Sequence, residues 1–269
     1  MSSVYDPWLR RWALTPDGDP IFSNWSQLLP VRRGNERLML KAAMAEQEIA
    51  GSVFLQGLDG EGAARVLERE HDAVLLERLD GPTALAELAK QQGDRAALAV
   101  LCGVAQRIHS LRSRPLFEGL IPVEQWFSAL TSAASERGSL DAQAAATFDA
   151  LLRTAGPRVV LHGDIHHANV MQRATGEWAA IDPKGLVGEA TLDFAMMIMV
   201  DVHAEGGIGD AQGAIRRAPF VADMAGLDTD RLLAWTFCQF ALYAIWARGH
   251  PIEAVWRPLA EGLLPFAMR

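Results

Sequence analysis

Residues 161–170, LHGDIHHANV, place three histidines, one aspartate and one asparagine directly after an apolar run. The histidines suggest a zinc site, but no partner cluster of ligands lies elsewhere in the sequence. Asp164 and Asn169 offer another explanation, because carboxylate and amide oxygens suit a hard divalent cation such as Mg²⁺, and a carboxylate can also act as acid or base. His162 is then expected to hydrogen-bond the loop backbone.

A predicted hairpin brings a further aspartate back to this loop. Strands are expected over 170–172 and 178–181, and Asp182 ends the second one. Far upstream, Lys41 lies on a strand predicted over 36–42, pointing into a cleft, so that its removal should leave the fold intact. A fixed positive charge beside a divalent cation suits a polyphosphate, because phosphoryl transfer depends on positioning and charge neutralisation.

The composition narrows the class of protein. The chain has 269 residues, half of them apolar, which is enough for a hydrophobic core and for two lobes. A formal net charge of -8 argues against nucleic-acid binding. Cys102 and Cys238 are expected to be core thiols in a reducing compartment. The N-terminal residues do not read as a secretory signal, and the apolar run 232–247 is too short to span a bilayer, so a cytoplasmic protein without membrane contact is expected.

Hydrophobic periodicity predicts a small antiparallel sheet followed by a helical region. The sheet region should contain a helix over 46–55 and strands over 36–42, 64–68 and 73–77. A Gly-Pro break at 81–82 marks the change to helical periodicity, which begins with an apolar stripe from 97 to 111. One strand should end at Leu161, and further helices are expected at 123–135, 141–154, 191–203, 212–225, 230–248 and 253–264.

Two motifs resemble those of a known family. The stretches HGDIHHAN (162–169) and IDPKGLVGE (181–189) look like the catalytic segments of aminoglycoside phosphotransferases, most closely the streptomycin 6-kinase and hydroxyurea phosphotransferase branch. The resemblance extends over most of the chain, from about Phe22 to Trp246.

This resemblance implies an α+β, protein-kinase-like fold with two lobes. Residues 1–79 would form a nucleotide-binding lobe around a small antiparallel sheet, and residues 80–269 a mostly helical lobe for catalysis and substrate binding. ATP and Mg²⁺ would be the cofactors, and the partner would be a small-molecule hydroxyl acceptor, cationic in character.

The resemblance also implies a role for each matching residue. Asp164 would be the catalytic base at the acceptor hydroxyl, and Asn169 and Asp182 would hold the metal. Lys41 would bind the nucleotide phosphates, with Glu48 on the following helix as its acidic partner.

Other nucleotide contacts are expected from the N-terminal region. Glu46 is the weaker alternative as partner of the strand lysine. The connection from Glu77 to Leu79 would offer backbone groups to the adenine. No GxGxxG precedes the lysine, and a polar loop takes its place, so phosphate contacts are expected from Ser23, Asn24 and Ser26.

Acidic side chains and a histidine are expected at the acceptor site. Residues 187–210 contain five acidic residues and no lysine or arginine, which gives this stretch a local charge of -5. Such a charge would attract a cationic acceptor, and Glu189 and Asp201 are expected to contact it. A solvated acidic face is an equal alternative. His166 is expected to face the substrate, whereas Asp193 is expected to support the catalytic loop.

The function implied by the resemblance is transfer of the γ-phosphoryl group of Mg·ATP to a streptomycin-like aminoglycoside, giving antibiotic resistance. A housekeeping kinase of a sugar, a choline-like amine or another metabolite is the alternative within the same fold. A catalytically silent nucleotide-binding scaffold conflicts with the full set of motif residues, and a zinc hydrolase would need ligands beyond the histidines. The sequence does not predict the oligomeric state.

Overall fold

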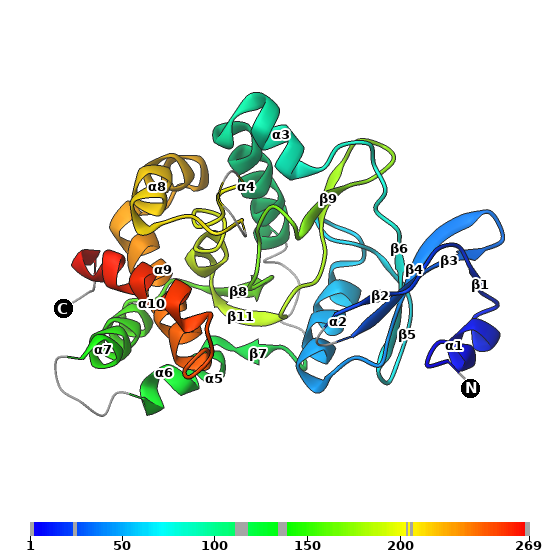
Figure 1. Ribbon diagram of the computed structural model, residues 1–269, viewed down its shortest axis with the longest axis horizontal. Coiled ribbons are helices and arrows are strands. Elements are labelled where there is room, and N and C mark those ends of the chain that lie inside the picture. The colour runs from blue at the N-terminus through cyan, green and yellow to red at the C-terminus, as the bar shows by residue number, and fades with distance from the viewer. Residues whose placement is uncertain are drawn as a thin grey trace.

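The computed structural model describes residues 3–23, 26–110, 118–133, 139–202, 204 and 207–266. An antiparallel sheet with one covering helix on either face forms the N-terminal region, and a larger helical region follows (Figure 1). This order of a small sheet and then helices is the one predicted from periodicity.

The N-terminal sheet has the strand order β1-β3-β4-β6-β5, antiparallel throughout, with β2 paired to β3. Its strands are β1 (Thr15–Pro16), β2 (Ile21–Phe22), β3 (Gln27–Arg33), β4 (Glu36–Ala42), β5 (Val66–Glu70) and β6 (Ala73–Glu77). The strands predicted over 36–42 and 73–77 are confirmed, and the one predicted at 64–68 begins two residues later.

Alternation along β4 gives the sheet two buried faces. Leu38 and Leu40 share an apolar cluster with the side chains of α1 (Asp6–Arg11), a helix that periodicity did not predict. The opposite face packs against α2 (Glu46–Leu58), which ends three residues beyond the predicted helix. Lys41 lies on this second face and is buried there.

The helices of the C-terminal region pack around a single core. They are α3 (Leu85–Gln92), α4 (Asp94–Ser110), α5 (Val123–Trp126), α6 (Ser128–Ser132), α7 (Leu140–Arg153), α8 (Ala211–Ala225), α9 (Thr229–Trp246) and α10 (Glu253–Leu263). The last four confirm predicted helices to within two residues at each end. Of the helices in the described residues, none is both long and apolar enough to cross a membrane.

The helix predicted over 191–203 is wrong. Its described residues form the 3-10 helix η1 (Ala190–Phe194) and then turns, and Val200 makes an isolated bridge to Ile208. Most side chains from 191 to 199 are buried, so apolar spacing there reflects burial on all sides rather than one helical face. The helix predicted over 123–135 is interrupted at Phe127 and forms two short helices in its described part.

The segments that carry the motifs lie on short strands between the sheet and the helices (Figure 1). β8 (Arg158–Leu161) pairs antiparallel with β11 (Leu186–Glu189), and β11 pairs parallel with β7 (Ile121–Pro122). Between β8 and β11 in the chain, β9 (Val170–Gln172) and β10 (Trp178–Ala180) form the predicted hairpin.

This hairpin is bound to the N-terminal region. The backbone N–H of Ala180 donates to Gly62 O at 2.9 Å, and the N–H of Ala64 donates to Ala180 O at 2.8 Å. Beyond β9, Arg173 donates to Glu77 Oε1 of β6 at 2.6 Å and also to backbone carbonyls that precede β5. The lobe boundary predicted at residues 79 and 80 falls in the connection from β6 to α3 and stays a prediction.

Candidate active site

His162 fixes the shape of the loop that follows β8. Its Nε2 donates to Ile181 O at 2.8 Å, and its Nδ1 accepts the N–H of Asp164 at 3.2 Å, which defines the neutral tautomer. Burial lowers the pKa of His162, so the ring stays uncharged at neutral pH. The expectation that this histidine braces the loop backbone is confirmed.

Asp193 supports the same loop from η1. Its carboxylate accepts the N–H groups of His162 at 3.0 Å and Gly163 at 2.6 Å, and His109 Nε2 of α4 donates to it at 2.8 Å. The side chain is fully buried. Its predicted role as structural support is therefore confirmed.

Asp164 and Asn169 are held together at the two ends of the loop. Asn169 Nδ2 donates to Asp164 O at 3.0 Å and lies 3.3 Å from Asp164 Oδ2. The N–H of Ile181 donates to Asn169 O at 2.8 Å, and Asp182 follows with a left-handed φ of 56°. That conformation is uncommon for a residue with a side chain, and it turns the chain where the hairpin rejoins the loop.

A buried ion pair joins the sheet, α2 and the hairpin. Lys41 Nζ is bonded to Glu48 and lies 2.7 Å from Asp182 Oδ1. Burial alone would raise the pKa of Asp182, but Lys41 and Lys184 outweigh burial and lower it. Asp182 is therefore ionised at neutral pH.

Lys184 lies beside both aspartates, and the sequence analysis gave it no role. Its Nζ lies 3.5 Å from Asp164 Oδ2 and 3.7 Å from Asp182 Oδ2. Burial alone would lower its pKa, but Asp164, Asp182 and Glu48 outweigh burial and raise it, so the ammonium is charged. The composition could have drawn attention to this residue, because the chain has 22 arginines and only three lysines. Two of the three, Lys41 and Lys184, lie at this site.

A cavity of about 260 Å³ between the sheet, α2 and the hairpin gathers most of the residues predicted to bind nucleotide and metal. Its walls include apolar side chains from both sides, among them Met39, Leu76 and Ile181. The predicted site residues that line it are Ser23, Ser26, Lys41, Glu48, Glu77, Leu79, Asn169 and Asp182. A slot with apolar walls and cations at one end suits a planar base with attached phosphates.

For several of these residues, the side chain is already bound within the protein and does not point freely into the cavity. The Glu77 carboxylate is bound to Arg173, which leaves the backbone of the β6 end as the part that faces the cavity. The hydroxyl oxygens of Ser23 and Ser26 lie 3.2 Å apart, so the two side chains hydrogen-bond to each other within their turn. Asn24 and the side chain of Glu46 lie outside the described part of the chain.

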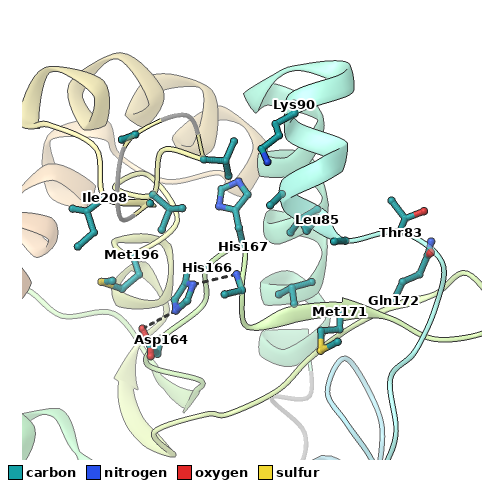
Figure 2. A pocket seen from close by; sticks show the side chains of 18 of the residues that line it. Thr83, Leu85, Lys90, Asp164, His166, His167, Met171, Gln172, Met196 and Ile208 are labelled. Carbon is teal, nitrogen blue, oxygen red and sulfur yellow. Dashed lines mark hydrogen bonds and ion pairs between the residues drawn. The ribbon is translucent and has the colours of Figure 1, made fainter. Parts of the chain in front are cut away.

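A larger cavity of about 780 Å³ opens on the other side of the catalytic loop. Figure 2 shows Asp164 and His166 pointing toward each other at its edge, with His167 farther along the same wall. His166 Nε2 lies 3.7 Å from Asp164 Oδ1, so this histidine does face the cavity. Aromatic rings of Tyr243 and Trp256 complete the wall from the helical side.

The described carboxylates of the acidic run do not line this cavity, which corrects the expectation for Glu189 and Asp201. Glu189 is buried and bound to Arg231, so it cannot contact an acceptor. Asp201 is turned to Arg217, whose Nη2 lies 3.1 Å from its Oδ2. Asp210 caps α8. Arginines from distant parts of the chain thus pair with Glu189 and Asp201 of this run.

The donor atoms fit magnesium better than zinc. Asn169 Nδ2 is directed at Asp164, which leaves Asn169 Oδ1 and the Asp182 carboxylate as hard oxygen ligands on one hairpin. Within the described residues, no three or more His, Cys, Asp or Glu side chains are grouped to hold a metal, so the histidines do not form a zinc site there.

Comparison with known proteins agrees with this arrangement. A model of the family described as aminoglycoside/hydroxyurea antibiotic resistance kinase matches residues 11–250. A streptomycin 3''-kinase from Klebsiella pneumoniae is 38% identical over 90% of this chain and 91% of its own, and a streptomycin 6-kinase from Streptomyces griseus is 32% identical over 88% and 79%. The structure of choline kinase from Streptococcus pneumoniae aligns with a TM-score of 0.66 at 12% identity, covering 97% of this chain and 98% of that one. The predicted protein-kinase-like fold is confirmed.

Proposed function

The chain belongs to the aminoglycoside/hydroxyurea antibiotic resistance kinase family, and from that premise we propose that it transfers the γ-phosphoryl group of Mg·ATP to a hydroxyl of a streptomycin-type aminoglycoside. Membership makes it a phosphotransferase. The assignment of each site residue rests on the geometry of the cleft.

The position of Asp164 between two cavities carries the proposal. Asp164 lines the larger cavity, while its neighbour Asn169 lines the smaller one together with Lys41 and Asp182. A carboxylate is needed at such a junction, because a hydroxyl in one cavity must lose its proton as it attacks phosphorus in the other.

In the proposed reaction, the acceptor oxygen forms a bond to the γ-phosphorus and the bond from that phosphorus to the β,γ-bridging oxygen breaks. The electron pair of the broken bond stays on ADP, and the hydroxyl proton passes to Asp164. Asn169 holds the Asp164 side chain in place through its amide. Positioning of this kind supplies much of the catalysis in phosphoryl transfer.

Asn169 and Asp182 would hold Mg²⁺, which when bound neutralises charge on the phosphate oxygens. Lys41, held by Glu48, provides a second and permanent positive charge for the nucleotide phosphates. The backbone from Glu77 to Leu79 provides the edge of the slot for the base.

The relatives differ in the hydroxyl that they phosphorylate. Identity of 38% to the streptomycin 3''-kinase, against 32% to the streptomycin 6-kinase, favours the 3''-hydroxyl for this chain. The test is incubation of the purified protein with streptomycin, ATP and Mg²⁺, followed by phosphorus NMR of the product. Phosphate on the 3'' position supports the proposal, and phosphate on the 6 position corrects the site of transfer.

One observation favours the metabolite-kinase alternative. Of the described residues that line the larger cavity, Asp164 is the sole carboxylate, and Tyr243 and Trp256 offer aromatic faces of the kind that bind a small quaternary or primary amine. Choline, ethanolamine and common sugars therefore belong in the same assay. Transfer to one of these and none to streptomycin would overturn the proposed acceptor, and an absence of any Mg²⁺-dependent ATP turnover would indicate a silent scaffold.

A further inference from the structure

Lys184 lies on a segment whose backbone is fixed on two sides. Its N–H donates to His162 O at 2.7 Å, which ties it to the catalytic loop. The next residue, Gly185, packs so closely on α2 that a Cβ there would lie 2.3 Å from Ala50 O. The start of the Lys184 side chain is therefore held in one place, and the side chain itself is mostly buried.

The ammonium of Lys184 lies between two carboxylates and forms a short hydrogen bond with neither. Its distances of 3.5 Å to Asp164 and 3.7 Å to Asp182 exceed the roughly 2.7–3.2 Å of a full hydrogen bond. Lys41 differs, because it is bonded to Glu48 and lies 2.7 Å from Asp182. Lys184 thus keeps its donors for a further ligand oxygen, while Lys41 already has two close partners.

The position of the Lys184 ammonium indicates which group of a bound ligand it would contact. Asp182 lines the smaller cavity, proposed for the nucleotide (the nucleotide cavity), and Asp164 lines the larger cavity, proposed for the acceptor (the acceptor cavity). Lys184 lies near both carboxylates, so a group that passes from the first cavity to the second would pass close to it. In the proposed reaction that group is the γ-phosphoryl group. Its equatorial oxygens carry the charge that a fixed cation stabilises during transfer.

We propose that the Lys184 ammonium binds the γ-phosphoryl group of the nucleotide and holds it against Asp164 while it moves to the acceptor. This inference rests on the proposed function. Lys184 gives up no proton and takes no electrons. It binds phosphate oxygen while the phosphorus changes partners and the acceptor proton goes to Asp164.

A structural reading of the same contacts makes a different prediction. If Lys184 only ties two aspartate-bearing segments together, then its removal should loosen the cleft and weaken every nucleotide alike. If it binds the γ-phosphoryl group, its removal should weaken nucleotides that carry this group and spare ADP. The ratio of the two affinities therefore separates the readings without measurement of activity.

The test is calorimetric titration of Lys184→Met with Mg·ADP and with the Mg²⁺ complex of the β,γ-imido analogue of ATP. We expect the dissociation constant of ADP to stay within about twofold and that of the analogue to rise roughly tenfold or more, as for a lost charge-assisted hydrogen bond. Single-turnover phosphorylation should slow by roughly 10²-fold to 10³-fold. Lys184→Arg should recover part of the analogue affinity, and Arg11→Gln, on the exposed side of α1, is the control.

Equal weakening of ADP and analogue, or no change in either, would overturn the role of Lys184. If Lys184→Met fails to fold, Lys184→Gln carries the same comparison. Wild-type protein that binds no nucleotide would overturn the proposed function and this inference together. A wild type that binds both nucleotides but phosphorylates no acceptor would remove only the acceptor assignment, and the affinity ratio would still decide the role of Lys184.

Discussion

At the scale of single residues, Asp164 and Asp182 have different surroundings within one site. Asp164 is bonded to the Asn169 amide and faces the acceptor cavity. Asp182 contacts Lys41 on the sheet side and faces the nucleotide cavity. These surroundings support the proposed roles, proton transfer for Asp164 and metal binding for Asp182.

We expect Asp164→Asn to keep Mg·ATP binding nearly unchanged and to lose turnover by on the order of 10²-fold or more, because the proton acceptor is gone. Asp182→Asn should lower both the rate and the Mg²⁺ dependence of nucleotide affinity. Titration of a fluorescent ATP analogue with and without Mg²⁺ measures the difference. The division of roles is wrong if Asp164→Asn loses metal-dependent binding as severely as Asp182→Asn.

Removal of Lys41 should destabilise the fold as well as impair nucleotide binding. Glu48 is buried, so Lys41→Met leaves a buried carboxylate without its cation, which costs about 3–5 kcal/mol. The double variant Lys41→Met/Glu48→Gln should recover most of that loss in urea unfolding while still binding nucleotide weakly. Equal stability of the single and double variants would show that the unpaired Glu48 carboxylate is not the cause of the lost stability. From the sequence an intact fold is expected instead, because Lys41 is predicted to point into a cleft and not into the core. The burial of both Lys41 and Glu48 is the reason for the different expectation here.

The site residues themselves were largely predictable, whereas their contacts were not. Lys41, Asp164, Asn169 and Asp182 were identified because the motifs resemble those of a family. Lys184 lies inside one of those motifs, yet its contact with Asp164 depends on how two loops pack. Spacing along the chain does not encode that packing.

At the scale of elements, prediction succeeded where one face of a helix is buried or where an apolar run is too long for a strand, and it failed over a shorter segment that is buried on all sides. The helices α7, α8 and α10 have one buried face, so their periods were visible, whereas α9 is buried throughout from Leu232 to Leu242 and was recognised by the length of its apolar run. Residues 191–199 are buried almost throughout, and their real conformation follows from the bonds of Asp193 to the catalytic loop. β11 was missed because its partners, β8 and β7, are far from it in sequence.

The described residues of the loop around Val200 and Ile208 line part of the larger cavity, and one arginine is bonded to this loop. Arg217 of α8 lies 2.9 Å from Asp94 of α4 and 3.1 Å from Asp201 of this loop. The cavity-lining residues Val200 and Ile208 are bridged within the loop, so a displaced loop would move that wall.

We therefore expect Arg217→Gln to raise the KM for the acceptor on the order of tenfold and to leave nucleotide affinity unchanged, since a charge-assisted hydrogen bond contributes about 1.5–3 kcal/mol. Steady-state kinetics with each substrate varied in turn measures both effects. Arg216→Gln, at the exposed neighbouring position, should change neither constant. A loss of nucleotide affinity in Arg217→Gln would mean that the arginine stabilises the whole lobe.

At the scale of the whole molecule, charge is balanced between segments that are distant in sequence. Glu189 pairs with Arg231 and Asp201 pairs with Arg217, although the run 187–210 contains no lysine or arginine. A count within a window could not reveal these partners, because folding brings them together. The net charge of -8 therefore describes the whole chain and cannot be assigned to the run 187–210.

Stability should fall as the pH drops below 6.5 because of a buried histidine. Burial and the nearby His166 lower the pKa of His167 to about 4. The unfolded chain binds a proton near pH 6.5 and the folded chain does not, so between these values acid favours unfolding. From pH 7.5 to pH 5 this amounts to about 2 kcal/mol.

Urea unfolding at several pH values measures this effect, with His167→Gln as the matched variant. The variant should lose about 2 kcal/mol less than the wild type over the same interval. Parallel pH profiles for the two proteins would exclude His167 as the origin.

The hairpin of β9 and β10 ties the N-terminal sheet to the helical region. Its backbone is bonded to residues 62–64, and Arg173 in its turn is bonded to Glu77 at the end of β6, so a rotation of the sheet against the helices would turn about an axis close to the hairpin. Displacement in a rotation grows with distance from the axis. Asn169 and Asp182, at the two ends of the hairpin, would therefore move least, and such a rotation would change the width of the smaller cavity while these two residues stay close together.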